Sequence, residues 1–173
     1  MSSICELQEW LKDYRKVVVL GIGNSLRQDD AIGLKIARRL RGKVPKNVEI
    51  VDCESVPENF LDKIARSQPT HILMIDATTL NSELGTSRLI LPNKISDFAI
   101  STHRISLNLL VDFLKKTTAA KVILLGIQPR NVDLGQQLTP GLERAAEKIA
   151  KVIVEAFQQL RSNANTAQKH KNS

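Results

Sequence analysis

The chain has few cysteines, few aromatic residues and no long apolar run, and each shortage excludes a class of protein. Its two cysteines, Cys5 and Cys53, lie far apart and form no CxxC pattern, which argues against a disulfide framework and suits a reducing cytoplasm. No apolar run approaches the roughly 20 residues that a membrane span requires. The N-terminal segment carries Glu6, Glu9 and Asp13 and lacks the apolar stretch of a signal peptide. We therefore expect a cytoplasmic protein without membrane insertion.

The charge balance does not indicate a nucleic-acid partner. The formal net charge is +7, and aromatic residues make up only 3% of the sequence. No aromatic side chains are interleaved with the basic ones for base stacking, and no nucleic-acid-binding motif is present. The basic residues crowded between Lys35 and Lys46 are typical of a solvated helix face, and steering of an acidic protein partner is the alternative. We expect no binding to nucleic acid.

Apolar runs alternate with segments of helical periodicity along the 173 residues, which is enough chain for one domain with its own core. The expected strands cover residues 17–22, 48–53, 71–76, 88–91 and 121–126. Helices are expected to begin near residues 4, 30, 57, 104 and 140. The turn between the third and fourth strands is too short for a crossover helix, so we expect these two strands to pair antiparallel.

This alternation predicts an α/β fold: a single-domain three-layer α/β/α sandwich around a mostly parallel, twisted five-stranded sheet, with one antiparallel strand. The domain is expected to cover residues 1–161. Residues 162–173 have no apolar face to bury, so we expect a disordered C-terminal tail.

The segment from Val17 to Gly33 carries the most information about chemistry. Its apolar run leads into Gly-Ile-Gly-Asn, and the pair Asp29-Asp30 stands where a helix should begin. Unpaired N–H groups and the helix dipole favour acidic residues there. Capping needs one acceptor, which Asp29 can supply, so the carboxylate of Asp30 is free for other work.

Two other polar residues interrupt the apolar pattern in a comparable way: Asp76 ends the third strand, and His103 precedes a helix. Ligands of open α/β sheets collect beyond the carboxyl ends of the strands. If the first and third strands flank a switch point, Asp30, Asp76 and His103 reach one cleft. Two carboxylates and an imidazole suit nickel or zinc, and three ligands leave coordination positions open for a substrate.

Each candidate ligand also has a purely structural interpretation. Asp30 fits as helix-start charge, Asp76 as an acceptor in the turn that follows its strand, and His103 as a helix cap. Cys53 ends the second strand near the same edge, and we interpret it as a small buried core residue rather than a metal ligand.

The strongest rival interpretation is a dinucleotide site. Gly21-x-Gly23 after a strand, with Asp52 or Glu54 at the end of the next strand, imitates the Rossmann fingerprint. The third glycine position is Leu26, which should block the approach of a pyrophosphate. The acidic pair before the helix would also face the phosphates, which is electrostatically unfavourable.

Five short motifs together resemble the hydrogenase maturation endopeptidases. They are Gly21-Ile-Gly-Asn-Ser-Leu with Asp29-Asp30 and Gly33, Val56-Pro-Glu-Asn59, Ile75-Asp-Ala-Thr78, Ser101-Thr-His103 with Leu107-Asn108, and Gly126-Ile-Gln-Pro129. They come in family order over roughly residues 17–140. The Thr-His piece of the fourth motif and the Gly-Ile-Gln-Pro piece of the fifth look most like the branch that serves hydrogenases of the hydrogenase 3 type.

The resemblance implies an endopeptidase that removes the C-terminal extension of a NiFe hydrogenase large-subunit precursor after nickel insertion. It matches Asp30, Asp76 and His103 to the metal-contacting positions, with Asp30 and Asp76 as catalytic carboxylates. The Ni²⁺ ion would arrive within the precursor and be held weakly by the isolated protein. Ala31 and Thr79 depart from common family residues, but neither is a ligand position. The alternative function is a non-catalytic nickel-handling or docking protein of hydrogenase assembly.

Overall fold

The computed structural model describes residues 3–98 and 104–171. A five-stranded sheet forms its centre, in the order β2-β1-β3-β5-β4. Its strands are β1 (Val17–Ile22), β2 (Val48–Glu54), β3 (His71–Ala77), β4 (Ser87–Ile90) and β5 (Lys121–Ile127). All pair in parallel except β4, which is antiparallel to β5. The expected mostly parallel sheet is thus confirmed.

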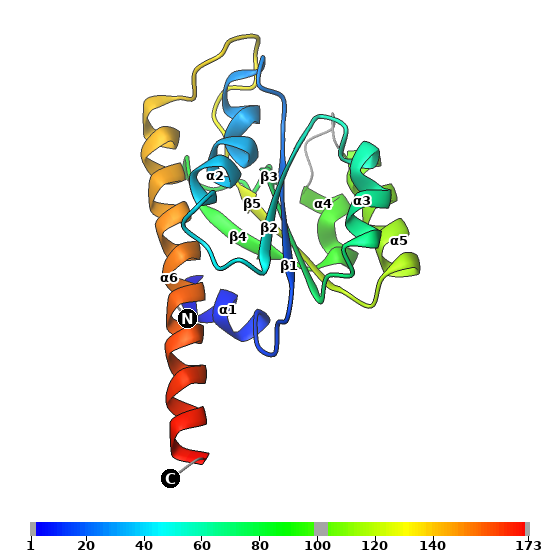
Figure 1. Cartoon of the computed structure of the whole chain (residues 1–173). Coiled ribbons are helices and arrows are strands. Elements are labelled where there is room, and N and C mark those ends of the chain that lie inside the picture. Colours follow the sequence, from blue (N-terminus) through cyan, green and yellow to red (C-terminus); the bar gives the residue numbers. More distant parts are fainter. Residues whose placement is uncertain (1–2, 99–103, 172–173) are drawn as a thin grey trace.

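Helices cover both faces of this sheet and make three layers (Figure 1). One face carries α1 (Ser3–Trp10), α2 (Ile32–Leu40) and α6 (Pro140–Lys171), and the other α3 (Leu61–Arg66), α4 (Ile95–Phe98) and α5 (Arg104–Thr117). Short 3₁₀ turns η1 (Gln28–Ala31), η2 (Pro57–Phe60) and η3 (Pro92–Lys94) lead into α2, α3 and α4. No helix within these segments combines the length and hydropathy needed to cross a bilayer.

Alternation along the central strands explains the two cores. Every residue of β1 is buried, because a parallel strand between two helical layers has no solvent face. Val17 and Val19 join the core beneath α2 and α6, whereas Val18 and Leu20 join the core beneath α3 and α5. The period of two along the strand thus supplies both cores from one apolar run.

The pairing partner of β4 corrects one expectation. We expected residues 88–91 to pair with the third strand, but β4 pairs with β5. Both sides of β3 are already hydrogen-bonded, to β1 and to β5. A short strand that follows β3 can therefore form its backbone hydrogen bonds with the outer side of β5, at the edge of the sheet.

The last helix also differs from the expected boundary. It runs from Pro140 to Lys171, past residue 161; the domain bounds at residues 1–161 and the disorder of residues 162–173 stay predictions. No Gly or Pro follows Gly141 in this part of the chain, so nothing stops the backbone ladder once the apolar face of the helix has ended.

Candidate functional site

The strand order creates a switch point between β1 and β3. The chain leaves β1 toward β2 on one side, whereas β3, β5 and β4 extend the sheet on the other. Connections on opposite faces diverge at such a point and leave a crevice beyond the carboxyl ends of the strands. β1 and β3 therefore flank a switch point, which is the condition that we set for Asp30, Asp76 and His103 to reach one cleft.

Close backbone packing holds Asp30 over this edge. A Cβ atom added at Gly33 would lie 2.1 Å from the carbonyl oxygen of Ile75 and 2.2 Å from that of Ile22. The first turn of α2 is therefore inserted between the ends of β1 and β3, which only a residue without a side chain permits. Turn η1, which contains Asp30 and contacts β3, lies directly before this insertion. Asp30 itself is 1% exposed.

Asp76 lies at the carboxyl end of β3 and is fully buried. One of its carboxylate oxygens accepts a hydrogen bond from the backbone N–H of Ala77 at 2.9 Å, which fixes the side chain beside its own strand end. Asp76 has the same parity as Ile72 and Met74, which face the core beneath α5. The structure therefore brings two buried carboxylates, those of Asp30 and Asp76, to the β1/β3 edge.

The third expected ligand, His103, lies outside the described residues. Helix α5 begins at the next residue, Arg104, on the face of the sheet toward which Asp76 points. Within the described part of the chain, no group of three His, Cys, Asp or Glu side chains is arranged to hold a metal ion.

Asp29 has a different role from the helix cap that we expected. It is fully buried, and its carboxylate accepts four hydrogen bonds from the loop between β5 and α6. The donors are the N–H groups of Arg130 (2.9 Å), Asn131 (3.0 Å) and Thr139 (2.7 Å) and the hydroxyl of Thr139 (2.9 Å). No side chain caps η1 or α2. Asp29 instead fastens a distant loop beside the site.

Backbone hydrogen bonds extend this attachment along both loops. The N–H of Gln28 donates to the carbonyl of Gly135 at 2.8 Å, and the N–H of Gly135 donates to the carbonyl of Leu26 at 2.9 Å. Leu26 and Leu134 project from the joined loops with 58% and 79% exposure. Sequence reasoning missed this apolar rim, because the two leucines are more than a hundred residues apart and neither belongs to a periodic segment.

Gln128 also emerges as a structural residue at this edge. Its side-chain oxygen accepts a hydrogen bond from the N–H of Leu80 at 2.7 Å, and its amide nitrogen donates to the carbonyl of Pro129 at 2.8 Å. Gln128 thereby joins the turn after β3 to the end of β5. The sequence feature that could have singled out Gln128 is the Gly-Ile-Gln-Pro motif, of which it is part.

Cys53 is a core residue, as expected. Its side chain is fully buried at the end of β2, and burial raises the pKa of its thiol to about 12. Metal ligation requires the thiolate, so this environment disfavours Cys53 as a ligand.

The geometry also opposes the dinucleotide interpretation. Asp52 and Glu54, the acids that would hold a ribose, are engaged by Arg38 at 2.8 and 3.0 Å. Arg41 forms a second ion pair with Asp52 at 3.0 Å. The acids at the end of β2 therefore pair with Arg38 and Arg41, two of the six basic residues between Lys35 and Lys46.

Comparison with known proteins agrees with this arrangement. The family model HycI, described as hydrogenase maturation protease, matches residues 34–156. The hydrogenase 3 maturation protease of Escherichia coli K12 is 35% identical over 133 residues, which cover 76% of this chain and 85% of that protein.

Solved structures extend the agreement to the fold. A crystal structure of a NiFe hydrogenase maturation protease from Thermococcus kodakarensis matches with a TM-score of 0.81 and 30% identity, covering 88% of this chain and 99% of that one. The solution structure of the endopeptidase HycI from Escherichia coli matches with a TM-score of 0.71 and 34% identity, over 79% and 88% of the chains. The chain belongs to the hydrogenase maturation protease family.

Proposed function

We propose that this protein is an endopeptidase that removes the C-terminal extension of a NiFe hydrogenase large-subunit precursor after nickel insertion. The observation that carries the proposal is the pair of buried carboxylates, Asp30 and Asp76, at the β1/β3 switch point of a chain from this family. Substrates of α/β proteins bind at this point.

Nickel enters this reaction as part of the substrate. The precursor would present its nickel ion at the carboxyl edge of the sheet, where Asp30, Asp76 and His103 contribute the protein's ligands. Carboxylate and imidazole groups suit this borderline ion. A precursor without nickel lacks these contacts and the positioning that they give to the scissile peptide, so cleavage reports that the metal has been installed.

The carboxylates have a second use in peptide hydrolysis. A buried Asp at the site can accept a proton from the attacking water and return it to the leaving amine. Asp76 is held beside its own strand end by the bond from Ala77, and Asp30 by the inserted turn of α2. The Asp76 carboxylate therefore keeps a fixed position, the backbone of Asp30 is held close to it, and the end of the precursor would be positioned at this edge.

The decisive experiment measures the intact mass of a large-subunit precursor, with and without nickel, before and after incubation with the protein. Loss of a C-terminal peptide from the nickel-loaded precursor alone is expected. If both samples keep their mass while a stable complex forms, the protein is a nickel-handling or docking factor instead.

Variants then test the assigned residues. Asp30→Ala and His103→Ala should abolish processing while the domain stays folded, as judged by circular dichroism. The matched control is Asp62→Ala, because Asp62 is an exposed aspartate on α3 to which no role in the site is assigned. Cleavage by Asp30→Ala at close to the wild-type rate would show that the site is wrongly assigned.

A further inference from the structure

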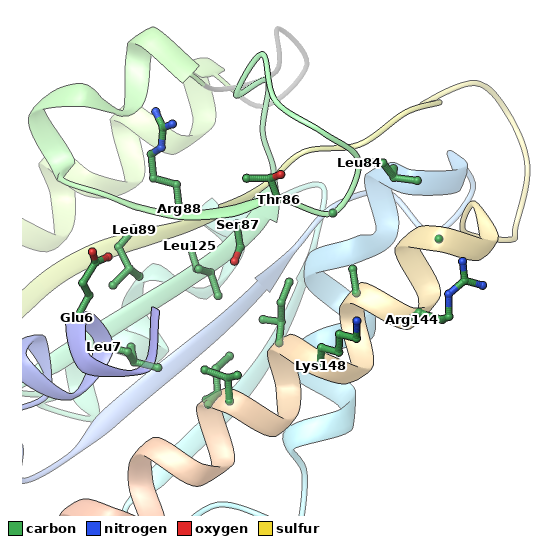
Figure 2. Close-up of a pocket in the computed structure, with 16 residues that line it drawn as sticks. Glu6, Leu7, Leu84, Thr86, Ser87, Arg88, Leu89, Leu125, Arg144 and Lys148 are labelled. Carbon is green, nitrogen blue, oxygen red and sulfur yellow. The ribbon is translucent and has the colours of Figure 1, made fainter. Parts of the chain in front are cut away.

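A groove of about 470 Å³ lies between edge strand β4, helix α1 and the first turns of α6 (Figure 2). We propose that this groove binds an extended segment of the large-subunit precursor, which adds to β4 as a further strand and carries a carboxylate at one end. This inference rests on the proposed function for the identity of the partner. It concerns a surface separate from the two buried carboxylates.

The backbone of β4 is open to a further strand. Within the described segments, β4 is the last strand of the sheet. Just before it, the N–H of Gln128 donates to the carbonyl of Thr86 at 2.9 Å. Hydrogen-bonded positions alternate along an antiparallel pair, so Arg88 also bonds toward β5, whereas the backbone groups of Ser87 and Leu89 point away from it. Outward groups of this kind are a template for strand addition.

The lining of the groove specifies the apolar part of the occupant. Leu89 on β4 and Ile149 and Val152 on α6 line it and are only half-buried. Leu89 packs against the core on the α6 side of the sheet. Side chains of an added strand alternate between the two faces, so every second residue of the bound segment would meet this apolar floor.

The charged side chains at the ends of the groove specify where the carboxylate of the bound segment lies. Arg144 and Lys148 lie one turn apart on α6 at the rim, both exposed, and within the described part of the chain neither forms an ion pair. Lys151, on the same helix, is paired with Glu155 at 3.8 Å. Glu6 of α1 lies at the opposite end of the groove (Figure 2). A carboxylate on the bound segment is therefore favoured beside Arg144 and Lys148 and disfavoured beside Glu6, which fixes the direction of the segment.

The groove lies on the α6 side of the sheet, opposite to the side that Asp76 faces, so a precursor bound there would pass the carboxyl edge of β5 to reach the carboxylates. Asp76 is in register with Gly126 on β5, which is in register with Arg88 on β4. A strand added to β4 would lie three strand spacings from Asp76, or roughly 14 Å. About four residues of extended chain cover that distance. A segment in the groove can therefore hold the precursor while a neighbouring part of the same protein reaches the carboxylates.

Binding of nickel-free precursor tests the groove without relying on cleavage. Calorimetry should show that the double variant Arg144→Glu, Lys148→Glu binds this precursor at least about tenfold more weakly than the wild type, since like charges then meet. Lys151→Glu, which reverses a charge on the same helix outside the groove, should bind within about twofold of the wild type.

A backbone variant and amide exchange test strand addition itself. Ser87→Pro removes an outward N–H at the first position of β4, where proline is tolerated, and should weaken binding to a similar degree. Bound precursor should slow amide exchange at Ser87 and Leu89. Unchanged affinity in both variants, or no added protection in β4, would overturn the proposal.

Other outcomes separate the groove from the proposed function. If the nickel-loaded precursor is not shortened by wild-type protein but nickel-free precursor still binds through the groove, the protease function fails and the docking surface stands. If sedimentation shows that the free protein is a dimer and that the charge reversal makes it a monomer, a second copy fills the groove, and the proposal is wrong.

Discussion

Replacing Asp29 by alanine removes one carboxylate that joins two distant parts of the chain. The lost hydrogen bonds come from three backbone N–H groups and one hydroxyl, at 2.7–3.0 Å. A hydrogen bond to a charged group contributes roughly 1.5–3 kcal/mol. The four hydrogen bonds share one acceptor group, so their contributions are not additive. The variant also avoids the cost of burying an ion, which is several kcal/mol and offsets part of the loss.

We therefore expect Asp29→Ala to lower the free energy of unfolding by about 3 kcal/mol, which a domain with roughly 5–15 kcal/mol of stability survives. Thr139→Val removes only the hydroxyl donor and should cost about 1 kcal/mol. Asp29→Asn is informative because its amide oxygen can replace the oxygen that accepts three bonds, while its NH₂ group then faces the N–H of Thr139. The free energy of unfolding that Asp29→Asn loses should lie between the losses in Asp29→Ala and Thr139→Val.

Urea unfolding gives these free energies, and amide exchange locates the damage. The protection of residues 130–139 should fall in Asp29→Ala, while that of the central strands β1 and β3 falls only as far as the global stability does. A loss of less than about 0.5 kcal/mol, the range of an ordinary surface substitution, together with unchanged exchange in this loop, would refute the assignment of Asp29 as its anchor.

Three further substitutions give separate tests. Gly33→Ala should destabilise the domain by roughly 3 kcal/mol or more, since its Cβ would meet two carbonyl oxygens at 2.1 and 2.2 Å; urea unfolding measures this, and a near-neutral effect would contradict the packing at the switch point. Burial lowers the pKa of His71 below its ordinary 6.5, so the unfolded chain binds the proton first and the free energy of unfolding falls as the pH drops below about 6.5. His71→Gln should therefore lose less stability than the wild type between about pH 7.5 and about pH 5.5, and equal losses in the two proteins would contradict this role of His71. Asp76→Asn keeps the size of the side chain but removes a base, so processing of nickel-loaded precursor should fall about a hundredfold or more; a rate within a few-fold of the wild type would exclude Asp76 as an essential carboxylate.

Local patterns were sufficient to predict most of the elements. The run from Val17 to Ile22 is apolar at every position apart from Gly21, and β1 has those bounds, because a doubly covered parallel strand needs no polar residue. The pairing of β4 was not available from such patterns. It depends on which strand still has unpaired backbone N–H and C=O groups once β3 has bonded to β1 and β5. That is a property of the assembled sheet.

The candidate site shows the same division. The position of Asp76 near a strand end was predictable from the apolar run that precedes it, and that of Asp30 from the transition between a strand and a helix; their role in a site stays a prediction. The partners of Asp29 were not predictable, since Arg130, Asn131 and Thr139 lie 101–110 residues away and donate mainly through the backbone, which carries no residue-specific signal.

We therefore predict separate tasks for the two adjacent acids in η1, and the geometry of the turn gives the reason. A 3₁₀ turn advances about 120° per residue, so neighbouring side chains leave it in different directions. Asp29 is directed to the loop before α6, whereas Asp30 directly precedes the insertion between β1 and β3. Loss of Asp29 should consequently lower stability and loop protection together with activity, and loss of Asp30 should abolish activity with stability retained. Two variants with the same stability loss would mean that the pair acts as one structural unit, and the assignment of Asp30 to the reaction would then fail.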